Sequence, residues 1–270
     1  MRGNLEKMTA SLQDTVQYAL PVGEHAVPLN ELLGQRLSLH FTGAIHCCAC
    51  GRKTRKSYSQ GHCYPCMKSL ARCDMCILKP ETCHFDQGTC REPEWGQSHC
   101  LVPHYVYLAN TSGIKVGITR HSQIPTRWID QGAVQATPVY KVASRRISGE
   151  VEVAIAGFMA DKTNWRALLK GEPEKIDLAA RLAGVRDEIA GRLDGIAAQF
   201  GAQAVTAVDE PVTEINYPVL EYPGKIVSHN FDKNPDVSGI LLGIKGQYLI
   251  FDTGVINVRK YTGYEVELDF

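Results

Sequence analysis

The sequence predicts an α+β protein. In it, a small β-barrel-like domain is formed by the N- and C-terminal segments, and a cysteine-rich module and a mixed α/β domain are inserted between them. Three observations predict this class. Short strand-like runs lie at both ends of the chain, every cysteine lies between Cys47 and Cys100, and helical spacing of apolar residues follows that block. A length of 270 residues is enough for two domains or for one domain with insertions.

Residues 1–45 are predicted to be an N-terminal β segment. The runs TVQYAL, HAVPLN and RLSLHFTGAI are strand-like and are broken by turn residues. Residues 204–270 are predicted to be a C-terminal β domain, from the runs VLEYP, GKIVSHNF, SGILLGIKG, QYLIFDTG, VINVRKY and YEVEL. We expect the two ends to pair with each other in a small barrel or curled sheet.

Residues 46–103 form a cysteine-rich block with too few apolar residues for a core of its own. The N-terminus is polar, and no apolar run approaches the roughly 18 residues that a membrane span needs. We therefore expect a soluble, cytoplasmic protein without a membrane partner. In that compartment, clustered Cys-x-x-Cys pairs favour metal binding over disulfides, and the metal would stabilise the fold of the block.

The first part of this block has the spacing of a zinc ribbon. Two Cys-x-x-Cys pairs are separated by twelve residues, and each pair presents two thiolates on a tight turn. Four thiolates complete the tetrahedron that structural Zn²⁺ prefers. The predicted ligands are Cys47, Cys50, Cys63 and Cys66.

The second part, CDMCILKPETCHFDQGTCREPEWGQSHC, has enough ligands for a second Zn²⁺. The spacing does not choose the ligand set. A cross-braced pair of sites and an iron–sulfur cluster are alternatives, because four thiolates serve either, and zinc is preferred. The predicted ligands are Cys73, Cys76, Cys83, Cys90 and Cys100, with His84 and His99 as further donors.

A basic loop lies between the two pairs of the first site. The chain has a net charge of +0, yet the stretch from Cys47 to Cys73 contains no acidic residue. Cations beside an aromatic ring suit phosphate contact and base stacking, whereas the alternative is a solvated charged loop. We expect this loop to bind nucleic acid through Arg52, Lys53, Arg55, Lys56 and Tyr58.

Residues 104–170 are predicted to be a mixed α/β domain, and residues 171–203 an amphipathic helix. The domain begins with a hairpin, followed by a short helix near Pro125, the strand TPVYKVA and a helix from about Gly149. The long helix is predicted from KIDLAARLAGVRDEIAGRLDGIAAQF, whose apolar residues recur at helical spacing.

The hairpin in YVYLANTSGIKVGITR decides which side chains meet. If residues 111–113 form a three-residue loop with Gly113 left-handed, Ala109 pairs with Lys115. Tyr107 and Lys115 then face the same side of the sheet, because side chains alternate along a strand. A two-residue loop would place them on opposite sides. Glycine at position 113 favours the first arrangement.

The motifs YVYLAN, IKVGITR and TRW resemble the GIY-YIG nuclease superfamily, in the branch whose second motif reads Lys-Ile-Gly or similar. The resemblance covers about residues 104–165. The whole chain is also similar to an uncharacterised bacterial family that joins a cysteine-rich segment to such a domain. The superfamily implies a Tyr on the first strand, a Tyr or Lys on the second, an Arg on the next helix, and a Glu on a later helix that binds one divalent metal.

The resemblance assigns these roles to Tyr107, Lys115, Arg127 and Glu152. Glu150 is an alternative for the metal ligand. Glu152 is preferred because excision-repair relatives place an accessory Asn about twelve residues later, where Asn164 stands. Two positions depart from the pattern, since residue 105 is Tyr where the family has Gly, and Lys115 replaces the second tyrosine.

Phosphodiester hydrolysis needs an activated water, neutralisation of transition-state charge and help for the leaving oxygen. By the resemblance, Tyr107 acts as general base if Lys115 lowers its pKa. Arg127 clamps the non-bridging oxygens, and Glu152 holds Mg²⁺ or Mn²⁺. His121 is a further proton carrier.

The sequence therefore predicts a metal-dependent DNA or RNA phosphodiesterase, a GIY-YIG-type endonuclease whose zinc module binds nucleic acid. The first alternative is a catalytically inactive, zinc-dependent nucleic-acid-binding protein. A weaker alternative is a redox or iron–sulfur protein, which the spare cysteines favour and the basic loop disfavours.

Overall fold

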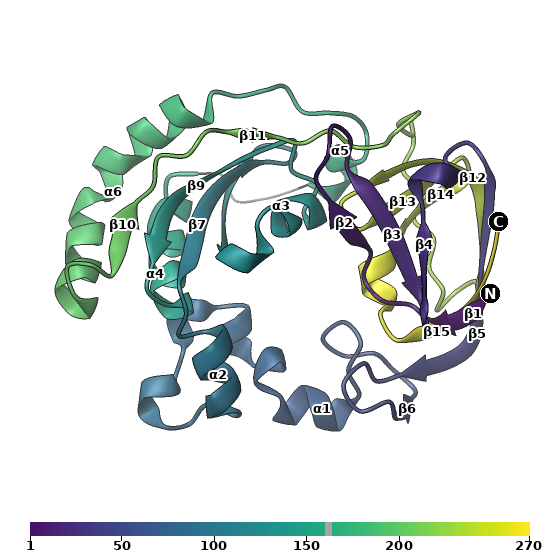
Figure 1. The fold of residues 1–270 in the computed structure, drawn as a ribbon, viewed down its shortest axis with the longest axis horizontal. Coiled ribbons are helices and arrows are strands. Elements are labelled where there is room, and N and C mark those ends of the chain that lie inside the picture. Colours follow the sequence, from purple (N-terminus) through teal and green to yellow (C-terminus); the bar gives the residue numbers. More distant parts are fainter. Residues whose placement is uncertain (160–163) are drawn as a thin grey trace.

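The computed structural model describes residues 1–159 and 164–270. A β-rich part made from both ends of the chain lies opposite a mixed α/β part, and the cysteine-rich segment joins them along one side (Figure 1). The two chain termini lie close together on the β-rich part (Figure 1).

The two ends of the chain pair with each other, as expected. Strand β5 lies between β15 and β12, so N-terminal residues are hydrogen-bonded on both sides to C-terminal ones. A smaller sheet, β2-β3-β4, packs with it. In sheet order the strands are β1 (Arg2–Asn4), β15 (Tyr264–Asp269), β5 (Arg36–His46), β12 (Asp236–Lys245), β13 (Tyr248–Phe251) and β14 (Gly254–Asn257), with β6 (Lys53–Thr54) also on β5. The smaller sheet contains β2 (Thr9–Ser11), β3 (Gln17–Val22) and β4 (His25–Pro28).

The expected barrel is wrong: within the described residues, no ladder closes this sheet on itself. Its two edge strands are β1, of three residues, and β14, of four residues. The chain leaves β14 directly into a 3₁₀-helix, η7 (Val258–Tyr261). Edges this short cannot supply the staggered pairing that barrel closure needs.

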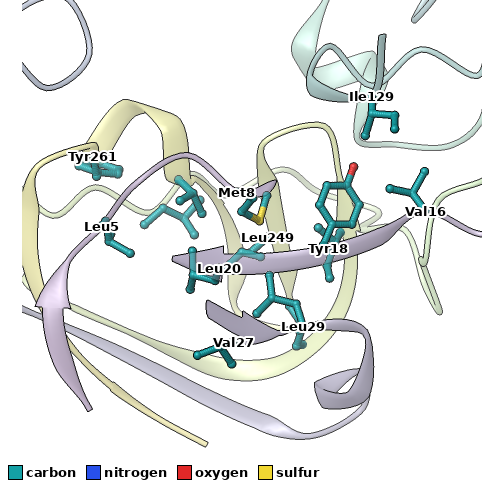
Figure 2. Close-up of a cluster of buried hydrophobic side chains, with 14 of the residues drawn as sticks. Leu5, Met8, Val16, Tyr18, Leu20, Val27, Leu29, Ile129, Leu249 and Tyr261 are labelled. Atoms are coloured by element: carbon teal, nitrogen blue, oxygen red, sulfur yellow. The ribbon is translucent and has the colours of Figure 1, made fainter. Parts of the chain in front are cut away.

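The core of the β-rich part also holds the α/β part in place. Alternate residues of β3, such as Tyr18 and Leu20, are buried against Leu29 and Leu249. Figure 2 shows these side chains together with Ile129, which belongs to helix α3 (Thr126–Asp130) of the α/β part. Helix α3 is therefore anchored in the core formed by the ends of the chain.

The α/β part is built on an antiparallel sheet in the order β10-β9-β7-β8, with β11 also on β9. Helices α4 and α6 pack on one face through a cluster that includes Leu108, Val151 and Ile189. The other face carries Tyr107 and lies toward α3 (Figure 1). The strands are β7 (His104–Asn110), β8 (Ile114–Arg120), β9 (Gln135–Val142), β10 (Val205–Ala207) and β11 (Thr213–Glu214), and the helices are α4 (Arg145–Ala156), α5 (Trp165–Leu168) and α6 (Leu178–Phe200).

Helix α4 begins four residues earlier than the sequence predicts. Ser144 is its N-cap, and the Ser144 hydroxyl accepts a hydrogen bond from the Ile147 amide at 3.4 Å. A serine cap followed by two arginines is compatible with a first helical turn, so the helix extends upstream of Gly149. Helix α6 begins after Asp177, which caps it in the same way.

Two of the expected C-terminal strands are absent from the described secondary structure. The runs VLEYP and GKIVSHNF contribute only isolated bridges, from Val219 to Gly243 and from Ser228 to Val255. Pro218 and Pro223 lack backbone N–H donors, so this stretch cannot sustain a ladder.

The cysteine-rich segment consists of short helices and turns. Large apolar side chains such as Leu78 and Met75 remain exposed, so its apolar core is small. None of the helices in the described ranges combines the length and apolar composition that a bilayer crossing requires. The short helices are α1 (Tyr64–Ser69), α2 (Pro93–His99), η2 (Ala71–Cys73), η3 (Met75–Ile77), η4 (Pro80–Thr82) and η5 (Phe85–Gln87), and elsewhere η1 (Asn30–Leu32) and η6 (His121–Gln123).

Candidate active site and metal centres

The β7–β8 hairpin has the predicted three-residue loop. Ala109 pairs with Lys115 and Tyr107 with Gly117, which puts Tyr107 and Lys115 on one face. Gly113 in the loop has a φ of +146°, a conformation that side-chain-bearing residues rarely adopt. The register expected from the glycine is confirmed.

Tyr107 lies directly over the glycine of the second motif. A Cβ atom on Gly117 would lie 2.6 Å from both Cζ and Oη of Tyr107. The ring also meets Trp128 edge-on, with ring centroids 6.0 Å apart. Gly117 therefore makes the room in which Tyr107 crosses the neighbouring strand.

The Tyr107 hydroxyl donates a hydrogen bond to Gln131 Oε1 at 2.8 Å. Burial of the side chain raises the pKa of Tyr107 to about 12, although the charge of Arg127 and a hydrogen bond from it act to lower that pKa. The lowered pKa that a general base requires is not found, because burial outweighs the contributions that lower the pKa of Tyr107. Tyr107 is neutral at physiological pH.

Arg127 and Glu152 both lie close enough to Tyr107 to act on its pKa through their charges. Arg127 is on α3 and Glu152 is on α4, and both side chains are partly buried. A guanidinium and a carboxylate therefore lie near the hydroxyl of Tyr107, the middle residue of β7. This arrangement can hold a phosphodiester beside a hard metal ion.

Lys115 and His121 lie on either side of Tyr107 along the hairpin. Lys115 is partly buried and two residues nearer the loop than Gly117, the residue opposite Tyr107. The His121 ring lies 5.4 Å from the ring of Tyr105. Both side chains are thus near the sheet face that carries Tyr107.

Asn164 is next to the tip of the hairpin. Its amide N donates to Ser112 Oγ at 3.0 Å, and its Oδ1 accepts from the amides of Arg166 and Ala167 at 3.0 and 3.3 Å. The Asn164 side chain thus caps helix α5. In the structure Asn164 therefore has the role of a helix cap. The accessory role in the site is what the resemblance implies.

Two residues of the site were not anticipated from the sequence. Gln131, four residues after Arg127, accepts a hydrogen bond from the Tyr107 hydroxyl. Arg145 is partly buried, donates to the Ile77 carbonyl at 2.7 Å, and interacts through its charge with Arg127 and Glu152. Spacing contained a signal for both, because Gln131 lies one helical turn beyond Arg127, and Arg145 lies two turns before Glu152.

The first cysteine cluster is assembled as the spacing predicts. The Sγ atoms of its four cysteines all lie within 4.8 Å of one another, and those of Cys50 and Cys63 are 3.8 Å apart. Burial acts to raise the pKa of Cys47, but hydrogen bonds from the amides of Cys63, Cys50 and Ala49 bring it down to about 6. Four convergent thiol groups can hold a tetrahedral metal ion, and the donor set suits zinc.

The second cluster differs from the prediction in its ligands. Donor atoms of Asp74, Cys76 and His84 lie within 4.8 Å of one another, and Asp74 had not been considered. Three further cysteines, Cys83, Cys90 and Cys100, lie near enough to raise the pKa of Cys76, after burial, through their charges. Cys73 is turned elsewhere, with its thiol hydrogen-bonded to Ser59. His99 stacks on Trp95, with ring centroids 4.3 Å apart.

The basic loop of the first cluster lies against the terminal β sheet. Its β6 pairs with β5, and Gln60 at its end accepts a hydrogen bond from Arg259 Nε at 2.7 Å. Lys56 lies over the Tyr58 ring, 5.4 Å from the centroid. The four basic side chains of the loop are exposed: Arg52, Lys53, Arg55 and Lys56.

Comparison with known proteins identifies one family. The family described as "Protein of unknown function (DUF2797)" matches residues 34–266, which covers the cysteine-rich segment, the α/β part and most of the terminal sheet. No curated protein and no solved structure gives a significant match to this chain.

Proposed function

This chain belongs to the DUF2797 family, and we propose that it is a metal-dependent nucleic-acid phosphodiesterase of the GIY-YIG type whose zinc module helps to bind the substrate. One observation carries the proposal: Arg127 on α3 and Glu152 on α4, which are far apart in sequence, both lie close enough to Tyr107 to act on its pKa through their charges.

The order of elements supports the same proposal. A hairpin, a short helix, a third antiparallel strand and a helix with Glu152 follow one another, and the third strand pairs with the first. The resemblance implies an arginine on the first helix and a glutamate on the second, where Arg127 and Glu152 lie. The close fit of Tyr107 over Gly117 gives a physical reason for the glycine in the second motif.

Each of the three residues has its own role in the proposed reaction. The Arg127 guanidinium holds the non-bridging oxygens and neutralises the charge that develops on them. Neutral, fully buried Tyr107 is oriented by Gln131 and positions Arg127 through the hydrogen bond between their side chains. Glu152 is a partly buried carboxylate that suits Mg²⁺ or Mn²⁺, and such an ion, when bound, supplies Lewis-acid stabilisation of the phosphate.

A second function is favoured by the state of Tyr107. Its hydroxyl is already hydrogen-bonded and its pKa is raised to about 12, which makes it a poor general base. A catalytically inactive nucleic-acid-binding protein would keep Arg127 and the basic loop for phosphate contact. In this second function the zinc module and the sheet recognise the strand without cutting it.

The two functions differ in the effect of removing Glu152. We expect wild-type protein with Mg²⁺ or Mn²⁺ to cleave pooled DNA or RNA at low salt, where phosphate contacts are strongest. Glu152→Ala should lower the rate by at least about a hundredfold, because loss of one group that stabilises the transition state has an effect of this size.

Glu150→Ala is the matched control. It removes a carboxylate two residues earlier on the same helix, also partly buried. Equal losses in both variants, or a loss in Glu150→Ala alone, would refute the assignment of Glu152. No cleavage by wild type, with binding retained, would support the recognition function.

A further inference from the structure

The basic loop and the terminal β sheet enclose two adjoining hollows. The first, of about 620 Å³, is lined by residues that include Phe41, Lys53 and Phe231. The second, of about 510 Å³, is lined by residues that include Lys56 and Lys260. Arg55 and Asp232 line both hollows, so the two meet at this pair.

Charge in these hollows is mainly positive. Lys53, Arg55, Lys56 and Lys260 contribute cations from exposed positions, against the single carboxylate of Asp232 among the lining residues. The loop pairs with β5 through β6, and the hydrogen bond from Arg259 to Gln60 connects it to η7, which carries Lys260.

Aromatic rings form the wall on the sheet side. Phe41 on β5 is partly buried, and its ring centroid lies 4.8 Å from that of Tyr264 and 6.0 Å from that of Phe231. Packing behind the ring fixes its orientation while part of its surface stays accessible. A fixed, partly exposed ring next to cations is the arrangement on which nucleobases stack.

Asp232 adds a directional acceptor beside this ring. Its Oδ1 accepts a hydrogen bond from the Tyr264 hydroxyl at 2.9 Å, which orients the carboxylate. The carboxylate can accept further hydrogen bonds, and the exocyclic amino group of cytosine is a donor that Asp recognises. Thymine and uracil lack that amino group.

We propose that the two hollows bind consecutive unpaired nucleotides of a nucleic-acid strand. A base stacks on Phe41 and donates its amino group to Asp232, while Arg55, Lys56 and Lys260 contact the adjoining phosphates. This inference rests on the proposed function and names the form of its substrate: a single-stranded or locally opened strand. Two hollows that share Arg55 suit a chain of nucleotides better than one free nucleotide.

The test is binding of labelled oligonucleotides by fluorescence anisotropy, in a Glu152→Ala background so that cleavage does not interfere. The probes are 12-mers of deoxycytidine and of deoxythymidine, a 12-base-pair duplex, and unlabelled dCMP as competitor. We expect the deoxycytidine 12-mer to bind more tightly than the deoxythymidine 12-mer and the duplex. We also expect dCMP to displace it only at concentrations at least a hundredfold higher.

Variants separate stacking from charge. Phe41→Leu keeps an apolar side chain but removes the ring, and it should weaken binding about tenfold without changing the salt dependence. Arg55→Ala should reduce the slope of log K against log salt by about 0.7, the value for one phosphate contact on a single strand. Asp232→Asn should reduce the preference for deoxycytidine over deoxythymidine, because the amide presents a donor as well as an acceptor.

Lys225→Ala is the control, since it removes one exposed cation of the β-rich part outside the lining residues. If Phe41→Leu and Arg55→Ala bind like Lys225→Ala, the hollows are not the site and the inference is overturned. The same holds if the duplex binds best, or if dCMP competes as well as the 12-mer.

The experiments distinguish failure of this inference from failure of the proposed function. If the wild-type protein does not cleave nucleic acid but shows this pattern of binding, the inference stands and the proposed nuclease activity is refuted. If the wild-type protein cleaves nucleic acid but the Phe41 and Arg55 variants bind oligonucleotides unchanged, the nuclease activity stands and the inference is refuted.

Discussion

Replacing Gly117 with alanine tests the packing on which the candidate active site depends. The new Cβ would lie 2.6 Å from Cζ and Oη of Tyr107, whereas carbon atoms in good contact are about 3.5–4.0 Å apart. The ring or the strand must therefore move by about 1 Å. Tyr107 is fully buried, meets Trp128 on its edge and is hydrogen-bonded to Gln131, so it cannot move without breaking these contacts.

Overpacking of this kind typically destabilises a protein by about 1–3 kcal/mol. We expect Gly117→Ala to lower the free energy of unfolding by that amount, measured in urea. If the protein is a nuclease, displacement of the Tyr107 hydroxyl by about 1 Å should also lower its rate about a hundredfold.

Two comparisons make the test specific. Gly191→Ala in the exposed middle of α6 has open space around its Cβ and should stabilise the protein by about 0.5–1 kcal/mol. In a Tyr107→Leu background, which removes the ring atoms that the new Cβ meets, Gly117→Ala should lose most of its effect. A neutral Gly117→Ala variant, or an equal loss in the Tyr107→Leu background, would refute the reasoning.

Two further predictions concern metal binding and pH. Cys63→Ser removes a buried ligand of the first cluster and should lower the bound metal by about one equivalent in elemental analysis. Cys48→Ser is the control, because Cys48 is adjacent to Cys47 but is not one of the four cysteines, and it should leave the metal content unchanged. Equal metal content in both variants would contradict the ligand set. Burial lowers the pKa of Lys245 from 10.5 to about 8, so between these values the unfolded chain binds a proton that the folded chain does not, and the free energy of unfolding should rise with pH there. Lys245→Met should abolish this rise, and parallel curves of urea stability against pH for the two proteins would refute it.

Local patterns predicted the parts of the site that depend on neighbouring residues. The hairpin register follows from Gly113 and the two-residue period of a strand, and both are properties of about ten residues. The first cysteine cluster follows from the spacing of two Cys-x-x-Cys pairs. Neither prediction requires knowledge of the tertiary contacts that the hairpin or the cysteine pairs make.

Properties that depend on distant parts of the chain were missed. The raised pKa of Tyr107 comes from burial under α3, which is itself held by the core of the terminal β segments. The ligands of the second cluster are brought together by consecutive short helices, whose turns have no periodic signal in the sequence. The prediction of a barrel failed for a similar reason. Closure depends on the length of the edge strands, and that length cannot be predicted from composition.

The cysteine-rich segment contacts the helix that carries part of the candidate active site. Helix α4, which carries Glu152, begins at Arg145, whose amide donates to the Cys100 carbonyl at 2.8 Å and whose guanidinium donates to the Ile77 carbonyl at 2.7 Å. One turn later, a Cβ atom on Gly149 would lie 2.7 Å from Pro80 Cβ and from the Glu81 amide, so α4 packs directly on η4. These contacts hold the first two turns of α4, on the N-terminal side of Glu152. Since the segment has little apolar core of its own, a metal that orders it would also fix α4, and with it the carboxylate that would hold the divalent ion in the proposed reaction.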